Sequence, residues 1–168
     1  MAPDAPEAVD PSESADTHSN VSRTTQEKHV ASLLYVESSA LLAALLEEDA
    51  DAVAALRGPG RLVTSALTIT ESYRGLVRAR VSARLDTDRE RLVVRALRTF
   101  ESRCGVISVT PAILERAGRP FPVEPIRTLD AIHLATAEAL GEPPALVTVL
   151  TRDSRVRQNA AALGYALA

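Results

Sequence analysis

The stretch Arg127-Thr-Leu-Asp-Ala-Ile-His-Leu-Ala-Thr-Ala137 predicts a helix from about Thr128 to Leu140, and the fold is built around it. Alanine, leucine and isoleucine occupy nearly every side of this helix, and a helix that is apolar almost all round is a buried one. An acid, Asp130, nevertheless stands in its first turn, and His133 follows one turn along on the neighbouring face. The sequence therefore places two polar side chains at the start of a core helix.

Each of these two side chains has an ordinary interpretation. Asp130 favours the positive end of the helix dipole, as acids in first turns commonly do. His133 suits a role as a packing residue or as a partner of Asp130. It is a weaker candidate for a metal ligand, because ligating histidines usually come with others, and His18 and His29 lie in or beside the N-terminal segment. A functional role for Asp130 requires further acids at the same place.

Composition excludes several classes of protein. The chain has 168 residues, which suggests one domain, and it is 46% hydrophobic but only 3% aromatic. So few aromatic side chains argue against recognition of nucleic acid by base stacking. A single cysteine excludes an internal disulfide and a zinc–cysteine cluster. No apolar run approaches the roughly 18 residues of a membrane span, and no secretion signal precedes the domain. We therefore expect a cytoplasmic protein that does not enter a membrane.

Charge divides the chain into two parts. Residues 1–28 hold six acids against Arg23 and Lys28, a net charge of −4, and are rich in proline and serine. Such a segment buries too little apolar surface to offset its ordering entropy, so a disordered acidic tail is expected. Residues 29–168 carry about +1, since the whole chain carries −3, and form the expected folded domain.

Strand and helix patterns alternate along that domain. Strands are expected at 32–36, 61–64, 105–109 and 145–150, with a short last strand at 165–167. Helices are expected at 40–47, 51–57, 87–102, 111–118, 128–140 and 153–163, and one more from Thr68 or Thr70 to about Ser82. This alternation predicts an α/β fold with a parallel sheet, and the apolar strands predict cover on both faces.

Four acids lie in the segments next to the predicted strands. Glu37 comes directly after the first strand, Glu71 lies in the expected first turn of the helix after the second, and Asp153 follows the fourth. Open parallel sheets bind ligands beyond the carboxyl ends of their strands, where these three acids belong. Asp130 precedes the fourth strand, and only the proline-rich loop 119–125 can bring it to the same edge.

Taken singly, each acid is explained as an ordinary helix-start residue. If the four converged, their repulsion would be severe without a cation, and oxygen ligands suit Mg²⁺ or Mn²⁺. Such a centre activates water and stabilises an oxyanion during phosphodiester cleavage. Other site types lack their signatures, because the chain has no glycine-rich phosphate loop and no G-x-S-x-G elbow.

The motifs together resemble those of a known family. In order, they are Tyr35-Val-Glu-Ser-Ser-Ala-Leu41, Thr68-Ile-Thr-Glu-Ser72, Leu129-Asp-Ala-Ile-His-Leu-Ala135 and Leu150-Thr-Arg-Asp153. This order resembles PIN-domain proteins, and in particular the VapC-type ribonuclease toxins of bacterial toxin–antitoxin pairs. The resemblance covers about residues 32–168.

The resemblance implies a three-layer α/β/α sandwich around a short, mostly parallel sheet of four or five strands. It implies an endoribonuclease with a Mg²⁺ site, in which Mn²⁺ is a possible substitute. Its catalytic acids are Glu37, Glu71, Asp130 and Asp153, of which Glu37, Asp130 and Asp153 are the expected metal ligands, and Ser39 and Thr151 are hydroxyls that support the acids. It also implies an RNA substrate, a homodimer, and an antitoxin that lays a peptide over the groove.

One residue departs from the family pattern. PIN-domain proteins usually have aspartate after the first strand, and this chain has Glu37. The extra methylene displaces the carboxylate by about one C–C bond, and Mg²⁺ tolerates little deviation from octahedral geometry. The alternative is therefore a non-catalytic RNA- or protein-binding module with a weakened metal site. A divalent-metal phosphatase or DNA nuclease on a similar fold is a third possibility.

Arginines follow the second strand in two groups. Arg74 and Arg78 are one turn apart on the helix that carries Glu71, and Arg91, Arg95 and Arg98 form a similar stripe on the next helix. Arginine binds phosphate in a planar, bidentate manner, so Arg74 and Arg78 are candidates for RNA binding. The alternative is a solvated helix face with ordinary ion pairs.

Overall fold

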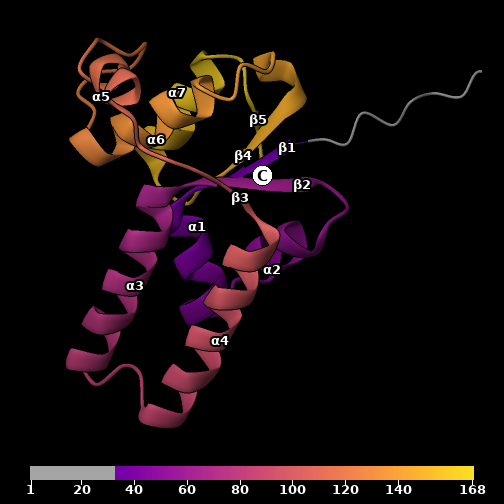
Figure 1. Cartoon of the computed structure of the whole chain (residues 1–168), viewed down its shortest axis with the longest axis vertical. Coiled ribbons are helices and arrows are strands. Elements are labelled where there is room, and N and C mark those ends of the chain that lie inside the picture. The colour runs from indigo at the N-terminus through magenta and orange to yellow at the C-terminus, as the bar shows by residue number, and fades with distance from the viewer. Residues whose placement is uncertain (1–32) are drawn as a thin grey trace, which may run out of the picture.

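A parallel five-stranded sheet forms the middle of the molecule, in a computed structural model that describes residues 33–168 (Figure 1). The strands are β1 (Leu33–Val36), β2 (Arg61–Ser65), β3 (Gly105–Ile107), β4 (Val147–Leu150) and β5 (Ala166–Leu167). Their order across the sheet is β3-β2-β1-β4-β5, and every neighbouring pair is parallel. The predicted parallel sheet is confirmed, whereas the predicted tail, residues 1–28, lies outside the described residues.

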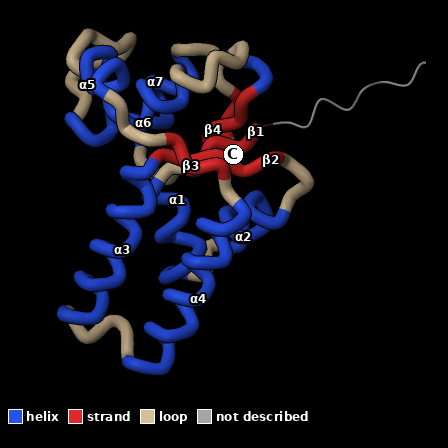
Figure 2. Tube along the Cα trace, in the orientation of Figure 1, coloured by secondary structure: helices blue, strands red, loops and turns tan. Residues whose placement is uncertain are grey.

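Helices cover both faces of the sheet (Figure 2). One layer holds α1 (Ser38–Leu42), the π-helical turn η1 (Ala43–Glu47), α2 (Ala50–Arg57), α3 (Ala66–Val81) and α4 (Thr87–Arg103). The other holds α5 (Pro111–Ala117), α6 (Thr128–Glu138) and α7 (Ser154–Ala162), and the 3₁₀ turn η2 (Pro144–Leu146) leads into β4. The three-layer α/β/α sandwich is therefore confirmed. No helix among residues 33–168 is long and apolar enough to cross a membrane.

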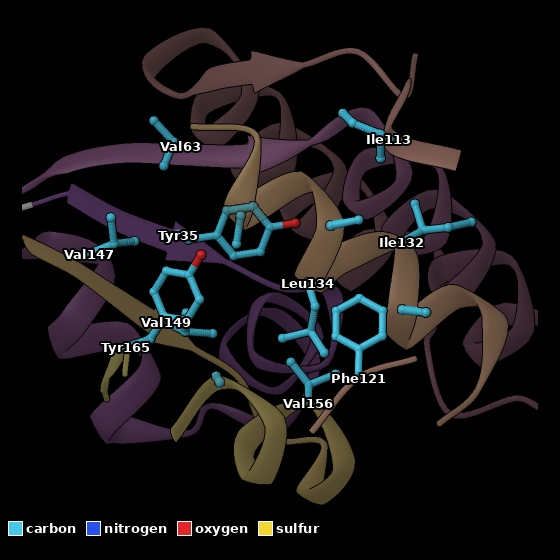
Figure 3. Close-up of a cluster of buried hydrophobic side chains, with 14 of the residues drawn as sticks. Tyr35, Val63, Ile113, Phe121, Ile132, Leu134, Val147, Val149, Val156 and Tyr165 are labelled. Atoms are coloured by element: carbon cyan, nitrogen blue, oxygen red, sulfur yellow. The ribbon is translucent and has the colours of Figure 1, made fainter. Parts of the chain in front are cut away.

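The central strand β1 has a core on each side. Leu33 and Tyr35 belong to the cluster beneath α5, α6 and α7, shown in Figure 3, and Leu34 and Val36 to the cluster against α1, α3 and α4. Successive side chains of a strand point to opposite faces, so a strand with helices on both sides must be apolar throughout. This explains why the four residues of β1 read as one continuous apolar run.

The strand order reverses between β1 and β4. From β1 the chain moves outward to β2 and β3, and it then returns to add β4 and β5 on the other side of β1. The last residues of the two central strands, Val36 and Leu150, are paired. A reversal of this kind opens a crevice at the carboxyl ends of the strands. Glu37 and Thr151, the residues that follow these two strands, are therefore next to each other at the crevice.

Two helix starts differ from the prediction by two residues or more. Helix α3 begins at Ala66, because the Ser65 side chain accepts a hydrogen bond from Leu67 N and caps it, so starts at Thr68 or Thr70 are wrong. As a consequence, Glu71 lies in the second turn of α3 and not in its first. Helix α1 begins at Ser38 and not at Ala40, because the Glu37 carboxylate itself caps this helix.

The core helix α6 agrees with the prediction in place and in burial. It spans Thr128–Glu138, and its residues from Ala131 to Ala137 are all buried. Leu129, in the first turn, differs from these residues because its side chain is 46% exposed. The first turn of α6 is therefore not buried on the side of Leu129. Asp130, in the first turn of α6, therefore directly precedes the buried run from Ala131 to Ala137.

Candidate metal centre

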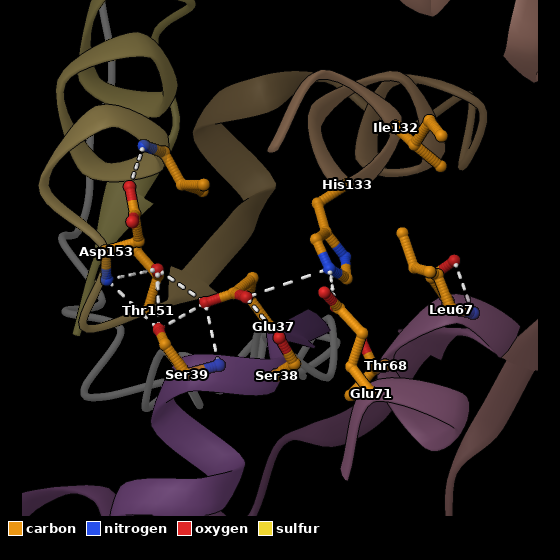
Figure 4. Close-up of polar contacts among 12 residues, drawn as sticks. Glu37, Ser38, Ser39, Leu67, Thr68, Glu71, Ile132, His133, Thr151 and Asp153 are labelled. Carbon is orange, nitrogen blue, oxygen red and sulfur yellow. Dashed lines mark hydrogen bonds and ion pairs between the residues drawn. The ribbon is translucent and has the colours of Figure 1, made fainter. Parts of the chain in front are cut away.

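The Glu37 carboxylate is held by donors on both of its oxygens (Figure 4). Oε1 accepts a hydrogen bond of 2.6 Å from Ser38 Oγ, and Oε2 accepts bonds of 3.0 Å from Ser39 N and 2.8 Å from Thr151 Oγ1. Ser39 Oγ also donates to Oε2. The side chain is almost fully buried. Glu37 therefore both caps α1 and presents a fixed negative charge at the crevice.

Ser39 joins Glu37 to the loop that follows β4. Its Oγ accepts hydrogen bonds from the backbone N–H groups of Arg152 (2.7 Å) and Asp153 (3.0 Å). The hydroxyl of Thr151 lies in the same network and accepts a bond of 3.1 Å from Asp153 N. The two hydroxyls predicted to support the acids thus lie between Glu37 and Asp153 and connect them.

Asp153 caps helix α7 with one of its carboxylate oxygens. Oδ1 accepts hydrogen bonds from Arg155 N at 2.8 Å and from Val156 N at 3.1 Å. This is the N-cap role that the sequence offered as the ordinary interpretation of Asp153. Both bonds reach the same oxygen, so the cap fixes the direction of the carboxylate while Oδ2 has no hydrogen bond within residues 33–168.

Asp130 lies outside the compact group of Glu37, Glu71 and His133, but the charges of two other acids act on it. Its Oδ2 is buried and has no hydrogen-bond partner among the described residues. Burial, and then the negative charge of Asp153, raise the pKa of Asp130 above its ordinary value, and the charge of Glu37 adds to this despite the opposing Arg127. Mutual repulsion is the mark of acids gathered in a small space. The acid whose placement depended on loop 119–125 thus lies in the field of two others.

His133 lies between Glu71 and Glu37. Its Nε2 is 2.7 Å from Glu71 Oε2 and 3.7 Å from Glu37 Oε1, and its ring is almost completely buried. The buried ring agrees with the predicted packing role of His133, and α3 places Glu71, rather than Asp130, within hydrogen-bonding distance of it. Burial works to raise the pKa of Glu71, but the hydrogen bond and charge of His133 outweigh it, so that pKa lies below its usual value.

A buried tyrosine completes this arrangement, although no pattern in the sequence predicts a functional role for it. The Tyr35 hydroxyl lies 3.3 Å from Nδ1 of His133 and belongs to a side chain that is 1% exposed. Burial, followed by the charge of Glu37, raises the pKa of Tyr35 well above its usual value, so the hydroxyl stays neutral. In a strand, a tyrosine is ordinarily a core residue, so only the packing of α6 on β1 reveals this contact.

The residues present fit a divalent cation. One ligand atom each from Glu37, Glu71 and His133 lie within 4.8 Å of one another. Asp130 is not part of that group. Its buried Oδ2 has no hydrogen-bond partner among the described residues, and the charges of Asp153 and Glu37 raise its pKa. Several carboxylates in a partly buried crevice repel one another, and a cation removes that repulsion. The compact group could hold a divalent cation, but it differs from the expected ligand set, because it contains Glu71 and His133 and leaves Asp130 and Asp153 outside.

The arginines of α3 and α4 divide into two groups. Ion pairs join Arg80 to Glu90, Arg89 to Glu48 and Arg91 to Asp88, as expected of a solvated helix face. Arg74 and Arg78 are both exposed, and neither forms an ion pair with another described residue. The charge of Arg78 helps to lower the pKa of Glu71, which places this arginine on the side of the acid cluster.

Comparison with known proteins identifies the family of this chain. Residues 34–162 match the PIN domain family. The chain is 37% identical to ribonuclease VapC46 of Mycobacterium tuberculosis over 136 residues, which covers 80% of this chain and 95% of that protein.

Two solved structures share the fold at low identity. VapC20 of Mycobacterium tuberculosis, described as a sarcin-ricin loop cleaving toxin, superposes with a TM-score of 0.56 at 19% identity, covering 79% of this chain and 95% of that one. VapBC-1 from nontypeable Haemophilus influenzae does so with a TM-score of 0.51 at 16% identity, covering 81% and 96%. The fold, the motifs and the identity to a VapC ribonuclease agree, and the chain therefore belongs to the PIN-domain family and, within it, to the VapC-type ribonucleases.

Proposed function

We propose that this protein is a metal-dependent endoribonuclease that hydrolyses RNA phosphodiester bonds and acts as the toxin of a type II toxin–antitoxin pair. The observation that carries the proposal is Asp130, a partly buried carboxylate whose buried Oδ2 has no hydrogen-bond partner among the described residues and whose pKa is raised by burial and by the charge of Asp153. An acid is kept in such a place at a cost to stability, and perturbed carboxylates in a crevice are typical of catalytic sites. Because the chain belongs to the VapC-type ribonucleases, RNA hydrolysis is the reaction proposed for this site.

Each acid has a distinct part in this proposal. Asp130 and Asp153 offer the free oxygens Oδ2, and Glu37 and Glu71 present carboxylates fixed by hydroxyls and by His133, respectively. Together they would hold a divalent cation. When bound, such an ion activates water and stabilises the developing negative charge on the phosphate. Mg²⁺ is the proposed ion because oxygen donors dominate, and Mn²⁺ is a substitute that tolerates the neighbouring imidazole.

RNA and an antitoxin are the proposed partners. Arg74 and Arg78 would contact substrate phosphates beside Glu71, and the loss of affinity with rising salt should report such contacts. The related proteins include one described as a toxin that cleaves the sarcin-ricin loop and one solved as VapBC-1, which supports a toxin with a cognate antitoxin. We further propose a homodimer that acts in the cytoplasm.

RNA cleavage by the purified full chain tests the proposal. Cleavage is expected with Mg²⁺ or Mn²⁺ and not in EDTA, and Asp130→Asn should lower the rate by about 100-fold or more. Asp88→Asn, at an acid that is 90% exposed on α4, is the matched control and should cleave like the unaltered chain. Cleavage that persists in EDTA, or an Asp130→Asn variant with full activity, contradicts the proposal.

One observation favours a second function. Glu37 Oε2 already accepts three hydrogen bonds, from the backbone and hydroxyl of Ser39 and from Thr151, so this oxygen is poorly available to a metal. A non-catalytic RNA- or protein-binding module follows if that engagement prevents the cation from binding. The same assay separates the two functions, because this module would bind RNA or a partner protein without cutting any RNA. In that case Glu37→Asp, which restores the residue usual in the family, should create cleavage.

A further inference from the structure

A bidentate ion pair lies directly beside the loop that carries Asp153. Arg152 Nε donates to Asp49 Oδ2 at 2.8 Å, and Arg152 Nη2 donates to Asp49 Oδ1 at 3.0 Å. Paired, parallel bonds of this kind fix geometry more firmly than a single contact does. The hydrogen bond from Arg152 holds the pKa of Asp49 well below its usual range, so the pair stays charged. Arg152 stands between Thr151 and Asp153 in the chain, so any movement of its backbone moves both.

Asp49 is itself fixed in place. It is the N-cap of α2, where its Oδ1 accepts a hydrogen bond of 2.9 Å from Ala52 N. The pair therefore joins the start of α2 to the turn between β4 and α7, two segments more than 100 residues apart in sequence. The opposite side of the same turn is held by Ser39 Oγ, which accepts from the backbone N–H groups of Arg152 and Asp153. The loop is thus held both by the Arg152–Asp49 ion pair and by the Ser39 hydroxyl.

We propose that Arg152 and Asp49 are positioning residues that hold the Thr151–Asp153 loop so that the Asp153 carboxylate faces the metal site. Neither residue touches the reacting atoms. This inference rests on the function proposed above, because it concerns the acid that helps to hold the cation. Residues that orient metal ligands from outside typically change metal affinity or activity by about 10–100-fold when removed.

The chain contains a matched control for this pair. Arg116 and Glu138 form a second ion pair, with Nε 2.7 Å from Oε2 and one hydrogen bond of 3.1 Å from Nη2 to Oε1. The side chains of the two pairs are equally exposed, at 29% and 28% here and 29% and 27% for Arg152 and Asp49. Glu138 is the last residue of α6, whereas Asp130 lies in its first turn. Loss of Arg116 therefore removes an ion pair of similar exposure far from the acids, together with the contact of its guanidinium with the Phe121 ring.

The experiment compares four full-chain variants: Arg152→Gln, Arg152→Lys, Asp49→Asn and Arg116→Gln. Amide hydrogen exchange across residues 151–157, measured by mass spectrometry in EDTA, reports on the loop without metal or substrate. The Mn²⁺ concentration that half-saturates binding, measured by isothermal titration calorimetry, reports on the site. Melting temperatures separate these effects from general instability.

Arg152→Gln and Asp49→Asn should speed exchange in the loop and raise the half-saturating Mn²⁺ concentration by about tenfold. Arg152→Lys keeps the charge but not the two parallel bonds, and should fall between Gln and the unaltered chain. Arg116→Gln should lower the melting temperature while leaving loop exchange and Mn²⁺ affinity unchanged.

Unchanged hydrogen exchange of the loop in Arg152→Gln overturns the proposal. It is also overturned if Mn²⁺ affinity falls in proportion to the melting temperature, and to the same extent, in Arg152→Gln and Arg116→Gln. Tighter RNA binding by Asp49→Asn also overturns it, since Arg152 would then be a phosphate ligand that Asp49 restrains. An unaltered chain that fails to cleave RNA refutes the proposed ribonuclease, while hydrogen exchange still decides whether the pair holds the loop.

Discussion

Glu37 shows how one side chain serves both folding and the site. A glutamate carboxylate extends far enough to turn back onto Ser39 N, which caps α1, while Oε1 remains 3.7 Å from the imidazole of His133. Its four donors consist of one backbone N–H and three hydroxyls, which come from Ser38, Ser39 and Thr151. Hydroxyls that donate to a carboxylate offset part of the cost of burying its charge. The departure from aspartate is thus matched by a set of donors built around the longer side chain.

Replacement of this carboxylate by an amide separates the two roles. In Glu37→Gln an NH₂ group replaces one acceptor oxygen and faces donors, so at least one hydrogen bond is lost in a buried place. We expect the free energy of unfolding to fall by about 1–3 kcal/mol, as measured by urea denaturation in EDTA. Thr151→Ser keeps its hydroxyl and is the control, which should change stability by less than about 1 kcal/mol. A Glu37→Gln variant as stable as the unaltered chain would show that these bonds contribute nothing to folding.

At the scale of elements, the approach of α3 to α1 sets the distance between two acids. Glu37 caps α1, and Glu71 lies on α3 one turn before Gly75, the residue at which the helices meet. A Cβ at Gly75 would lie 2.6 Å from Leu42 Cδ2 and 2.9 Å from Cδ1, closer than real contacts allow. A larger residue at this position therefore requires the Leu42 side chain to move, whereas glycine fits as the helices are packed, although it lowers helix propensity.

A larger residue at this point should push the helices apart. We expect Gly75→Val to lower the free energy of unfolding by about 1–3 kcal/mol through overpacking. The loss of unfolding free energy caused by Gly75→Val should be smaller in a chain that also carries Leu42→Ala, because the clash is with the Leu42 side chain. A double-mutant cycle measured by urea denaturation gives this coupling energy. Additive effects of the two substitutions would place the cost of the valine elsewhere.

Sequence reasoning predicted the elements well and their contacts poorly. Alternating patterns identified all five strands, and the acids that follow β1 and β4 could be placed at one edge because parallel strands end together. The contact between Glu71 and His133 could not be foreseen, since it depends on how α3 and α6 are packed from different layers of the sheet. The start of α3 was missed because Ser65, Thr68 and Thr70 are all plausible caps by type, and only the backbone selects Ser65.

For the molecule as a whole, the ionised carboxylate of Asp130 lowers stability when no cation is bound. The raised pKa of Asp130 means that the folded state binds a proton at this site more tightly than the unfolded state does. Above that pKa the ionised group therefore opposes folding, and the penalty disappears as pH falls and the group becomes protonated. A fold that brings carboxylates of this kind close together depends on a bound cation for part of its stability. Such a loss of stability is common at catalytic sites.

Asp130→Asn tests this trade-off directly. In EDTA at pH 7 the variant should be more stable than the unaltered chain by a few tenths to about 1 kcal/mol, because a repelling charge is removed from a partly exposed group. The difference should vanish near pH 3, where Asp130 is protonated in both states of the unaltered chain. Saturating Mn²⁺ should reverse the order, since a cation that binds only the folded state stabilises the chain that binds it better. Urea denaturation with and without metal measures both effects, and Asp88→Asn should respond to neither. A metal-free Asp130→Asn variant that is less stable at pH 7 would show that the carboxylate supports the fold, contrary to the repulsion inferred from its surroundings.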